Sequence, residues 1–145
     1  TSILLQASPT SNVVSFPSTA GISVAGNITG NTAGYPIGYL NIPQVSFAAN
    51  ATLALTDAGK HYYSTLSTAN TLTIANNTSV SWAVGTAITI VNRGSANMTI
   101  AQGSGVSLYL AGNSTAANRT LTTYGMATIM NVAANVWMIN GTGVV

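Results

Sequence analysis

The chain has 145 residues, of which 47% are hydrophobic and only 3% are charged, namely one acid and three bases, together with one histidine and no cysteine. A single carboxylate cannot form the pair that glycosidases use, and one histidine with one aspartate cannot close a zinc or iron site. No run of Lys or Arg could neutralise successive phosphates, which disfavours nucleic-acid binding. We therefore predict a protein that is not an enzyme and has no catalytic residues, no cofactor and no metal.

The composition favours a folded domain rich in strands. Thr, Val, Ile and Tyr suit strands, whereas Glu is absent and Leu and Lys are few, so long surface helices lack their preferred residues. No run approaches about 18 consecutive apolar residues, and residues 1–6 lack the charged start and apolar core of a secretory signal. We expect no membrane partner, and a length of 145 residues suits one domain with an appendage.

The first 45 residues predict an extended N-terminal arm. They contain all four prolines, which argue against central strands, yet they are too apolar for a solvated tail. We expect the arm to bury its apolar side chains on the same protomer or on a neighbour. The predicted subunit-interface residues of this arm are Ile3, Leu4, Leu5, Phe16, Tyr35, Pro36, Ile37, Tyr39, Leu40 and Ile42.

From about Ser46 onward, short alternating runs are separated by turn residues at intervals of roughly ten residues. Residues 52–55 and 60–65 flank the turn 56–59 and predict a hairpin. Further strands are predicted at 71–75 and 79–84. Residues 87–92 and 98–102 flank the five-residue connection 93–97 and predict the clearest hairpin.

The last part of the chain predicts strands at 106–110, 118–122, 124–133 and 136–140, with a tight turn at Ala134-Asn135. The total is eight or nine strands. The predicted fold is all-β: an antiparallel, jelly-roll-like β-sandwich over residues 46–145, preceded by the extended arm of residues 1–45.

Asp57, His61 and Ser64 could nominally supply an acid, a base and a nucleophile. The surrounding sequence offers no nucleophile elbow or comparable scaffold, so we interpret Asp57 as accepting backbone N–H bonds in its own turn and His61 as a surface or interface residue. The Gly-x-Gly pieces at 103–105 and 141–143 do not open helices, and we interpret both as turns.

The aromatic residues allow two interpretations, a sugar-stacking surface or packing within the core and strands, and we favour packing. The residues concerned are Trp82, Trp137, Tyr62, Tyr63, Tyr109 and Tyr124. The four methionines, Met98, Met126, Met130 and Met138, are predicted to fill the core.

Several pieces of the sequence, taken in order, resemble a small β domain common in virion proteins of tailed bacteriophages, from about residue 38 to the C-terminus. They are Gly38-Tyr39-Leu40-Asn41-Ile42-Pro43-Gln44, Leu55-Thr56-Asp57-Ala58-Gly59-Lys60-His61, residues 85–92, Leu110-Ala111-Gly112, Arg119-Thr120-Leu121, residues 124–128 and residues 137–143. The resemblance implies a phage structural protein, either a capsid decoration (cement) protein or a tail-fibre or spike domain, and it brings no catalytic residues.

We expect decoration of the outer capsid surface, because the chain has no long shaft and its arm suits lacing over neighbouring capsomers. The expected partners are the major capsid protein and further copies of the chain, which we hypothesise to form a homotrimer because uncharged sheet edges invite pairing. With so few ions, assembly should be nearly insensitive to salt. The alternatives are a fibre or adhesin domain that binds host glycan and a bacterial surface-layer or pilus-like subunit.

Overall fold

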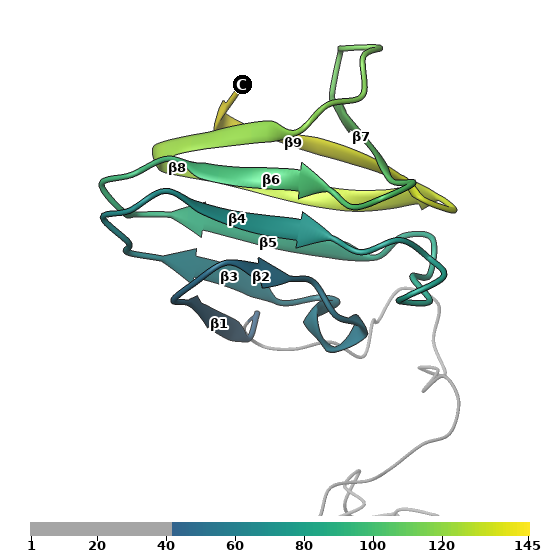
Figure 1. Ribbon diagram of the computed structural model, residues 1–145, viewed down its shortest axis with the longest axis horizontal. Coiled ribbons are helices and arrows are strands. Elements are labelled where there is room, and N and C mark those ends of the chain that lie inside the picture. The colour runs from purple at the N-terminus through teal and green to yellow at the C-terminus, as the bar shows by residue number, and fades with distance from the viewer. Residues whose placement is uncertain (1–41) are drawn as a thin grey trace, which may run out of the picture. The chain divides into compact units, whose positions relative to one another are not determined.

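The computed structural model describes residues 42–145, which fold as an all-β domain, as predicted (Figure 1). The first half contains β1 (Gln44–Phe47), β2 (Ala51–Thr52), the short 3-10 helix η1 (Leu55–Asp57), β3 (His61–Ser64), β4 (Asn70–Ile74) and β5 (Ala87–Asn92). The second half contains β6 (Met98–Gln102), β7 (Ser107–Leu110), β8 (Arg119–Ala133) and β9 (Val136–Val144). Nothing helical in this part of the chain is long and apolar enough to cross a membrane.

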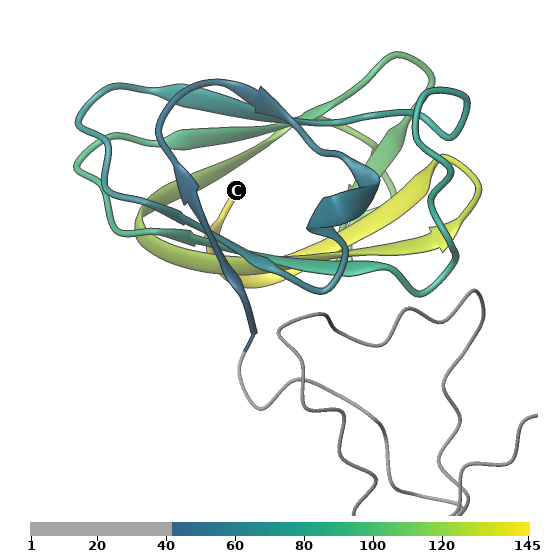
Figure 2. The same cartoon turned by 90° about the horizontal axis from the view of Figure 1, so that it is seen from below.

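All nine of these strands belong to one sheet, which is organised around the 15-residue strand β8. One end of β8 pairs with β6 and the other end pairs with β5, while β9 runs beside it. We call β1, β3 and β5 the first limb and β2, β4 and β6 the second limb. Figure 2 shows how the sheet curves back on itself so that the two limbs face each other in a nearly closed barrel.

The prediction of antiparallel pairing is wrong for both limbs and for the pair β7–β9. Five strand pairs are parallel, β1–β3, β3–β5, β2–β4, β4–β6 and β7–β9, and the three pairs that involve β8 are antiparallel. Neither of the two predicted hairpins forms. The chain alternates between the two limbs, and each time it returns to a limb it adds a strand parallel to the previous strand of that limb. The connection 93–97 therefore joins facing strands, not neighbouring ones.

Other predicted elements differ in extent. Residues 79–84 form a loop, and the two segments 118–122 and 124–133 merge into the single strand β8. The turn at Ala134-Asn135 is confirmed, with Asn135 in the left-handed region at φ 58°. Strand β1 begins at Gln44, two residues before the predicted boundary, and the rest of the predicted arm lies outside the described residues except for Ile42 and Pro43.

Alternation of apolar and polar residues explains how the limbs form a common core. In β5, for example, Ile88 and Ile90 are buried while Thr89 and Val91 are only partly so. The same period of two operates in β4, β6 and β9, so that each strand presents one face to the interior. The largest fully buried side chains are Trp137, Leu53, Leu72, Ile74, Ile88, Ile90, Met98, Ile100, Leu108, Leu121, Ile129 and Ile139.

Candidate docking surface

Of the ten predicted interface residues, only Ile42 belongs to the described part of the chain. Its side chain is 56% exposed, and its carbonyl oxygen lies 3.2 Å from Nδ1 of His61. The other nine residues, from Ile3 to Leu40, lie outside the described residues. Their role as an interface stays a prediction.

The structure does not bring Asp57, His61 and Ser64 together as an acid, a base and a nucleophile. The Asp57 carboxylate is buried and accepts the backbone N–H of Ala54 at 2.8 Å, which confirms its predicted role in the turn. Ser64 faces the interior, where its hydroxyl accepts the N–H of Leu66, whereas His61 lies near Ile42. Within residues 42–145, no group of three or more His, Cys, Asp or Glu side chains could hold a metal ion.

The two Gly-x-Gly pieces behave differently. Residues 103–105 form the predicted turn, with Gly105 at φ 77°. Residues 141–143 are part of β9, so their interpretation as a turn is wrong. Glycine is required there because a Cβ at Gly141 would overlap the backbone of Met126 and Ala127 on β8.

The packing interpretation is confirmed for three of the aromatic residues, because Trp82, Trp137 and Tyr62 are buried. Tyr124 is different: it is 78% exposed and has a positive φ of 58°. Among the methionines, Met98 fills the core as predicted. Met126 and Met130 are 57% and 45% exposed, so the core-filling prediction is wrong for both.

These exposed methionines belong to what we call the outer face, formed by side chains that point away from the barrel interior on β5, β8 and β9. The register places Met126 between Val91 and Thr142, and Met130 between Ala87 and Met138. Between these two rows, the hydroxyls of Thr89 and Thr128 lie 3.2 Å apart. The outer face consists of Ala87, Thr89, Val91, Met126, Thr128, Met130, Met138, Asn140 and Thr142. It contains no charged residue.

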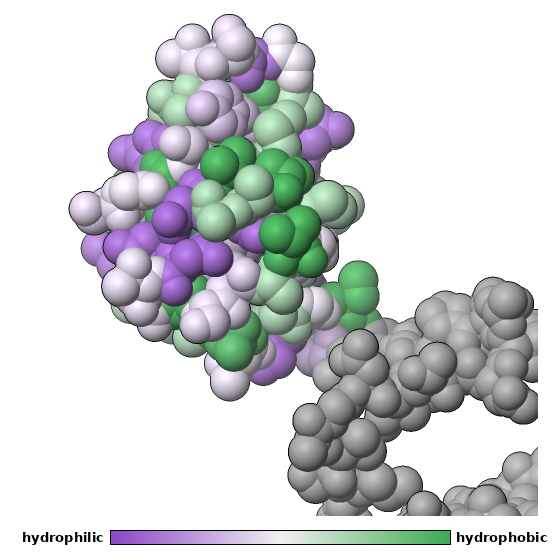
Figure 3. Space-filling view, turned by 90° about the vertical axis from the view of Figure 1, so that its right-hand side faces the viewer, coloured by the Kyte–Doolittle hydropathy of each residue, from purple (hydrophilic) through white to green (hydrophobic). Residues whose placement is uncertain are grey.

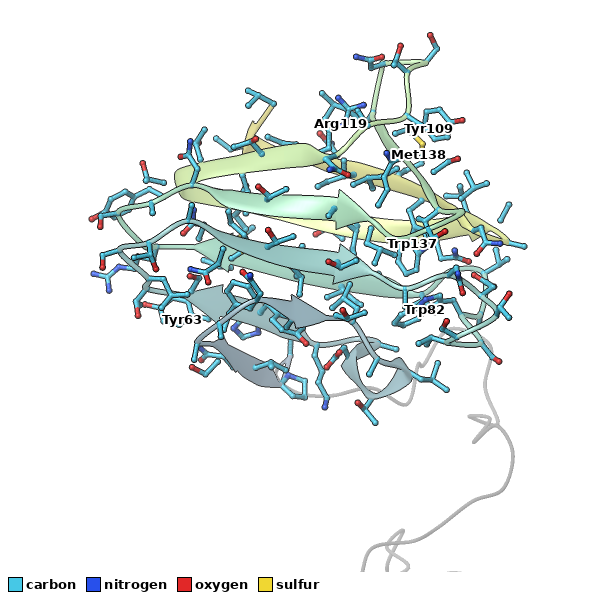
Figure 4. The ribbon with its side chains drawn as sticks, in the orientation of Figure 1. Tyr63, Trp82, Tyr109, Arg119, Trp137 and Met138 are labelled. Carbon is cyan, nitrogen blue, oxygen red and sulfur yellow. The ribbon has the colours of Figure 1, made fainter. Side chains whose placement is uncertain are left out.

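A shallow apolar pocket lies on this face beside β8. It is lined by Ala111, Thr128, Met130, Met138, Ile139 and Asn140. Figure 4 shows Met138 close to Tyr109, in agreement with the pairing of these two residues between β9 and β7. The pocket therefore offers thioether and methyl groups to a partner.

Further apolar side chains are exposed at the C-terminal end of β8 and in the loop before β5. Val84 and Val132 are 68% and 42% exposed, and their segments are joined by the hydrogen bond from the Gly85 N–H to the Asn131 carbonyl at 2.8 Å. Figure 3 looks at the domain from the right-hand side of Figure 1 and shows hydrophobic side chains gathered over part of this end, beside polar ones. Large exposed apolar side chains that cluster in this way are typical of interaction sites.

At the other end of β5, two tyrosines flank an arginine. The guanidinium of Arg93 donates a hydrogen bond from Nη1 to the Tyr63 hydroxyl at 3.3 Å. This hydrogen bond, together with the electrostatic influence of Tyr63 and Tyr124, raises the pKa of Arg93 above its ordinary value. Arg93 is exposed and stays charged at any physiological pH.

No protein-family model matches the sequence, and no curated protein is significantly similar to it. The surface must therefore be interpreted from its own chemistry. Its thioethers, methyl groups, hydroxyls and single guanidinium contain no nucleophile activated by a base. They can instead bury apolar area and form hydrogen bonds with another molecule.

Proposed function

We propose that the chain is a structural protein of a bacteriophage virion, which decorates the outer capsid surface and docks onto the major capsid protein through its outer face. The observation that carries the docking role is the exposure of Met126 and Met130 in the middle of an uncharged sheet face. Methionine is enriched at protein interfaces, and burial of one such side chain stabilises a complex by about 1.5–3 kcal/mol. The assignment to a virion rests on the resemblance carried by residues from about 38 onward.

Self-association would use a different part of the domain. β1 and β2 are the terminal strands in the order of the sheet, and no strand among residues 42–145 pairs with their outer edges. Neither strand carries a charged side chain, so nothing repels an approaching strand. We propose that these edges contribute to a trimer, and mass determination in solution at micromolar concentration tests this, since a monomer would contradict it.

The docking role is tested by cosedimentation with empty capsids of the phage that encodes the chain. The double variant Met126→Ser/Met130→Ser should bind more weakly by about tenfold or more. Each side chain has about half of its surface left to bury, so the two together contribute about 1.5–3 kcal/mol, and 1.4 kcal/mol corresponds to a factor of ten. Leu55→Ser is the matched control, because Leu55 is 53% exposed but belongs to η1, which contributes no residue to the outer face. Equal binding by all three proteins would reject the outer face as the docking surface.

The N-terminal arm needs its own experiment. Deletion of residues 1–37 should weaken binding to the same capsids if the arm spans the joints between capsid subunits. The double methionine variant provides the comparison, since it alters the barrel and leaves the arm intact. Unchanged binding after the deletion would refute the arm hypothesis without affecting the outer face.

The second candidate is a tail-fibre or adhesin-type domain that binds host glycan. The exposed ring of Tyr124 favours it, since aromatic faces stack on the apolar faces of sugars. A glycan array separates the two candidates. Selective binding that is lost in Tyr124→Ala would favour the fibre domain, and location of the protein on capsid hexamers or pentamers by electron microscopy would favour decoration.

A further inference from the structure

We infer that Tyr63, Arg93 and Tyr124 form a binding site for a carboxylate side chain, an aspartate or glutamate, of a different protein that docks on the outer face. This inference rests on the proposed docking function and specifies the chemistry of the partner. We call these three residues the arginine site.

The backbone brings the three residues together from separate strands. Asn92, the last residue of β5, pairs with Gly125 of β8, so that Arg93 comes next to Tyr124. On the other side, the Arg93 N–H donates to the Ser64 carbonyl at 2.9 Å, which continues the pairing of β5 with β3 and places Arg93 beside Tyr63. The guanidinium thus bonds to the Tyr63 hydroxyl, and the register of β5 with β8 brings Tyr124 to the neighbouring position on its other side.

Within these 145 residues, Arg93 has no exposed acidic side chain to pair with. Asp57 is the only acid among the 145 residues. Its carboxylate is buried at η1, where it accepts the Ala54 N–H and interacts with the Tyr62 hydroxyl. A guanidinium offers five N–H donors in a planar fork that matches a carboxylate, and Tyr63 accepts one of the hydrogen bonds from Nη1.

Tyr124 is held in an unfavourable backbone conformation with its ring exposed. Its φ of 58° is rare for a bulky residue, and it lies in an irregular part of β8 between the pairs of Leu121 and Met126. A Cβ on the next residue, Gly125, would lie 2.7 Å from Leu121 Cδ1 and 2.8 Å from the Thr122 carbonyl oxygen, so the backbone is tightly constrained here. Strain of this kind is concentrated at functional sites.

Charge complementarity identifies the occupant as a protein other than this one. Among these 145 residues, a second copy has one acidic side chain, the buried Asp57, so homo-association through this site would pair neither guanidinium with an acidic side chain. The site is continuous with the outer face, because Val91 and Met126 lie in the row next to Arg93 and Tyr124. Arginine, tyrosine and methionine together are the residues enriched at protein interfaces, whereas exposed thioethers match sugar hydroxyls poorly.

The test uses the full chain, immobilised, and a displayed library of random dodecapeptides as the probe. We expect the selected peptides to combine Asp or Glu with apolar residues. Their affinity should fall about tenfold or more in Arg93→Gln and partly in Arg93→Lys, which keeps the charge but loses the fork. Lys60→Gln is the matched control, because it removes the same charge from the turn before β3.

The outcomes separate this inference from the proposed function. Peptides that bind Arg93→Gln as well as the wild type, but lose binding in Met126→Ser/Met130→Ser, would overturn the carboxylate site and leave docking on the outer face intact. Peptides that bind all variants equally would count against both. Binding of 3′-sialyllactose that requires Arg93, with no acidic peptide selected, would replace the protein partner by an acidic glycan and overturn the inference.

Discussion

Trp82 and Trp137 meet edge to face in the interior, with ring centroids 5.3 Å apart and an angle of 89° between the ring planes. Trp137 belongs to β9, whereas Trp82 lies in the connection between β4 and β5 and donates its Nε1–H to the Ala75 carbonyl at 2.8 Å (Figure 4). The pair therefore fixes a long connection against the sheet. Aromatic pairs of this geometry add about 0.5–1.5 kcal/mol to the area that they bury.

The first prediction concerns this pair. Trp82→Ala should lower the free energy of unfolding by about 3–5 kcal/mol, because it removes a buried ring and leaves a cavity. Trp82→Phe keeps a ring and loses mainly the hydrogen bond to Ala75, so it should lower it by a smaller amount, about 1–3 kcal/mol. Guanidinium unfolding followed by circular dichroism gives both values, and equal losses would contradict the packing role.

Removal of the polar side chain of Asn92 should lower the stability of the fold strongly. Its amide is buried and donates to the carbonyls of Ala96, Leu121 and Thr122, while its oxygen accepts the Gly94 N–H. Asn92→Ala leaves these groups without partners and should lower the free energy of unfolding by about 2–4 kcal/mol. Asn140→Ala, at an exposed position on β9, is the control and should change it by less than about 0.5 kcal/mol. Similar urea midpoints for the two variants would disprove the bridging role of Asn92.

Tyr62 predicts a dependence of stability on pH in the alkaline range. Burial, followed by the hydrogen bond to Asp57 and the charge of Asp57, raises the pKa of the Tyr62 hydroxyl above the ordinary tyrosine value of about 10. The folded state therefore holds this proton more tightly than the unfolded chain. The resulting stabilisation is fully present below about pH 10 and is lost as the pH rises further.

Tyr62→Phe provides the check, because it removes the titrating group and keeps the ring. The wild type should lose more stability than Tyr62→Phe between pH 9 and 12, by about 1.4 kcal/mol for each pH unit above 10 within the shifted range. Urea unfolding at several pH values measures this difference. If stability changed with pH in the same way in both proteins, the folded and unfolded states would bind the Tyr62 proton equally tightly, which would contradict the prediction.

The positive φ of Tyr124 predicts that glycine is tolerated better than alanine at this position. Relief of the positive φ should make Tyr124→Gly more stable than Tyr124→Ala by about 1 kcal/mol, since only glycine adopts this region freely. Thermal unfolding of the two variants compares them directly, and both lack the ring. A more stable alanine variant would mean that the backbone of β8 is not strained at Tyr124. If the ring serves docking, both variants should also bind capsids less tightly.

The stability of the proposed trimer should depend little on salt concentration. The strands proposed to pair carry no ions, so the trimer should persist between low and molar NaCl. Docking through Arg93 should weaken over the same range, since an exposed ion pair is screened. Sedimentation velocity for the trimer and cosedimentation for capsid binding measure the two effects separately, and dissociation of the trimer by salt would contradict the proposed edge contact.

Composition and alternation predicted the strands well and their partners poorly. Residues 87–92 alternate in the same way whether the next strand lies beside them or opposite them, because only the inward face is specified. The five-residue connection 93–97 suggested a hairpin, but Gly94 lies so close to the backbone of Leu66 that any side chain would overlap it. Leu66 lies in the connection from β3 to β4, and Gly94 lies in the connection from β5 to β6. The two connections meet because β3 and β5 are neighbours in the sheet, which the local sequence does not specify.

The sequence of β8 contains the pattern of the outer face, which the core-filling prediction for the methionines does not take into account. Met126-Ala127-Thr128-Ile129-Met130 places apolar residues at both alternating sets of positions, although one side of a sheet normally faces water. Burial of Ala127 and Ile129 in the barrel leaves the methionines outside. The exposure of Tyr124 could not be predicted, because it depends on an irregularity within β8 that merges two predicted strands.

The position of β8 in the chain constrains how the protein can fold. Both limbs hydrogen-bond to this strand, yet residues 119–133 are synthesised after almost everything else in the barrel. Until they leave the ribosome, β5 and β6 each have an unpaired edge, and the stacked strands behind them share an unclosed interior. Closure joins segments far apart in sequence, which slows folding. The nascent chain therefore passes through a period in which its most apolar strands are open to pairing with other copies. This period ends only when residues 119–145 have been synthesised and have formed β8 and β9.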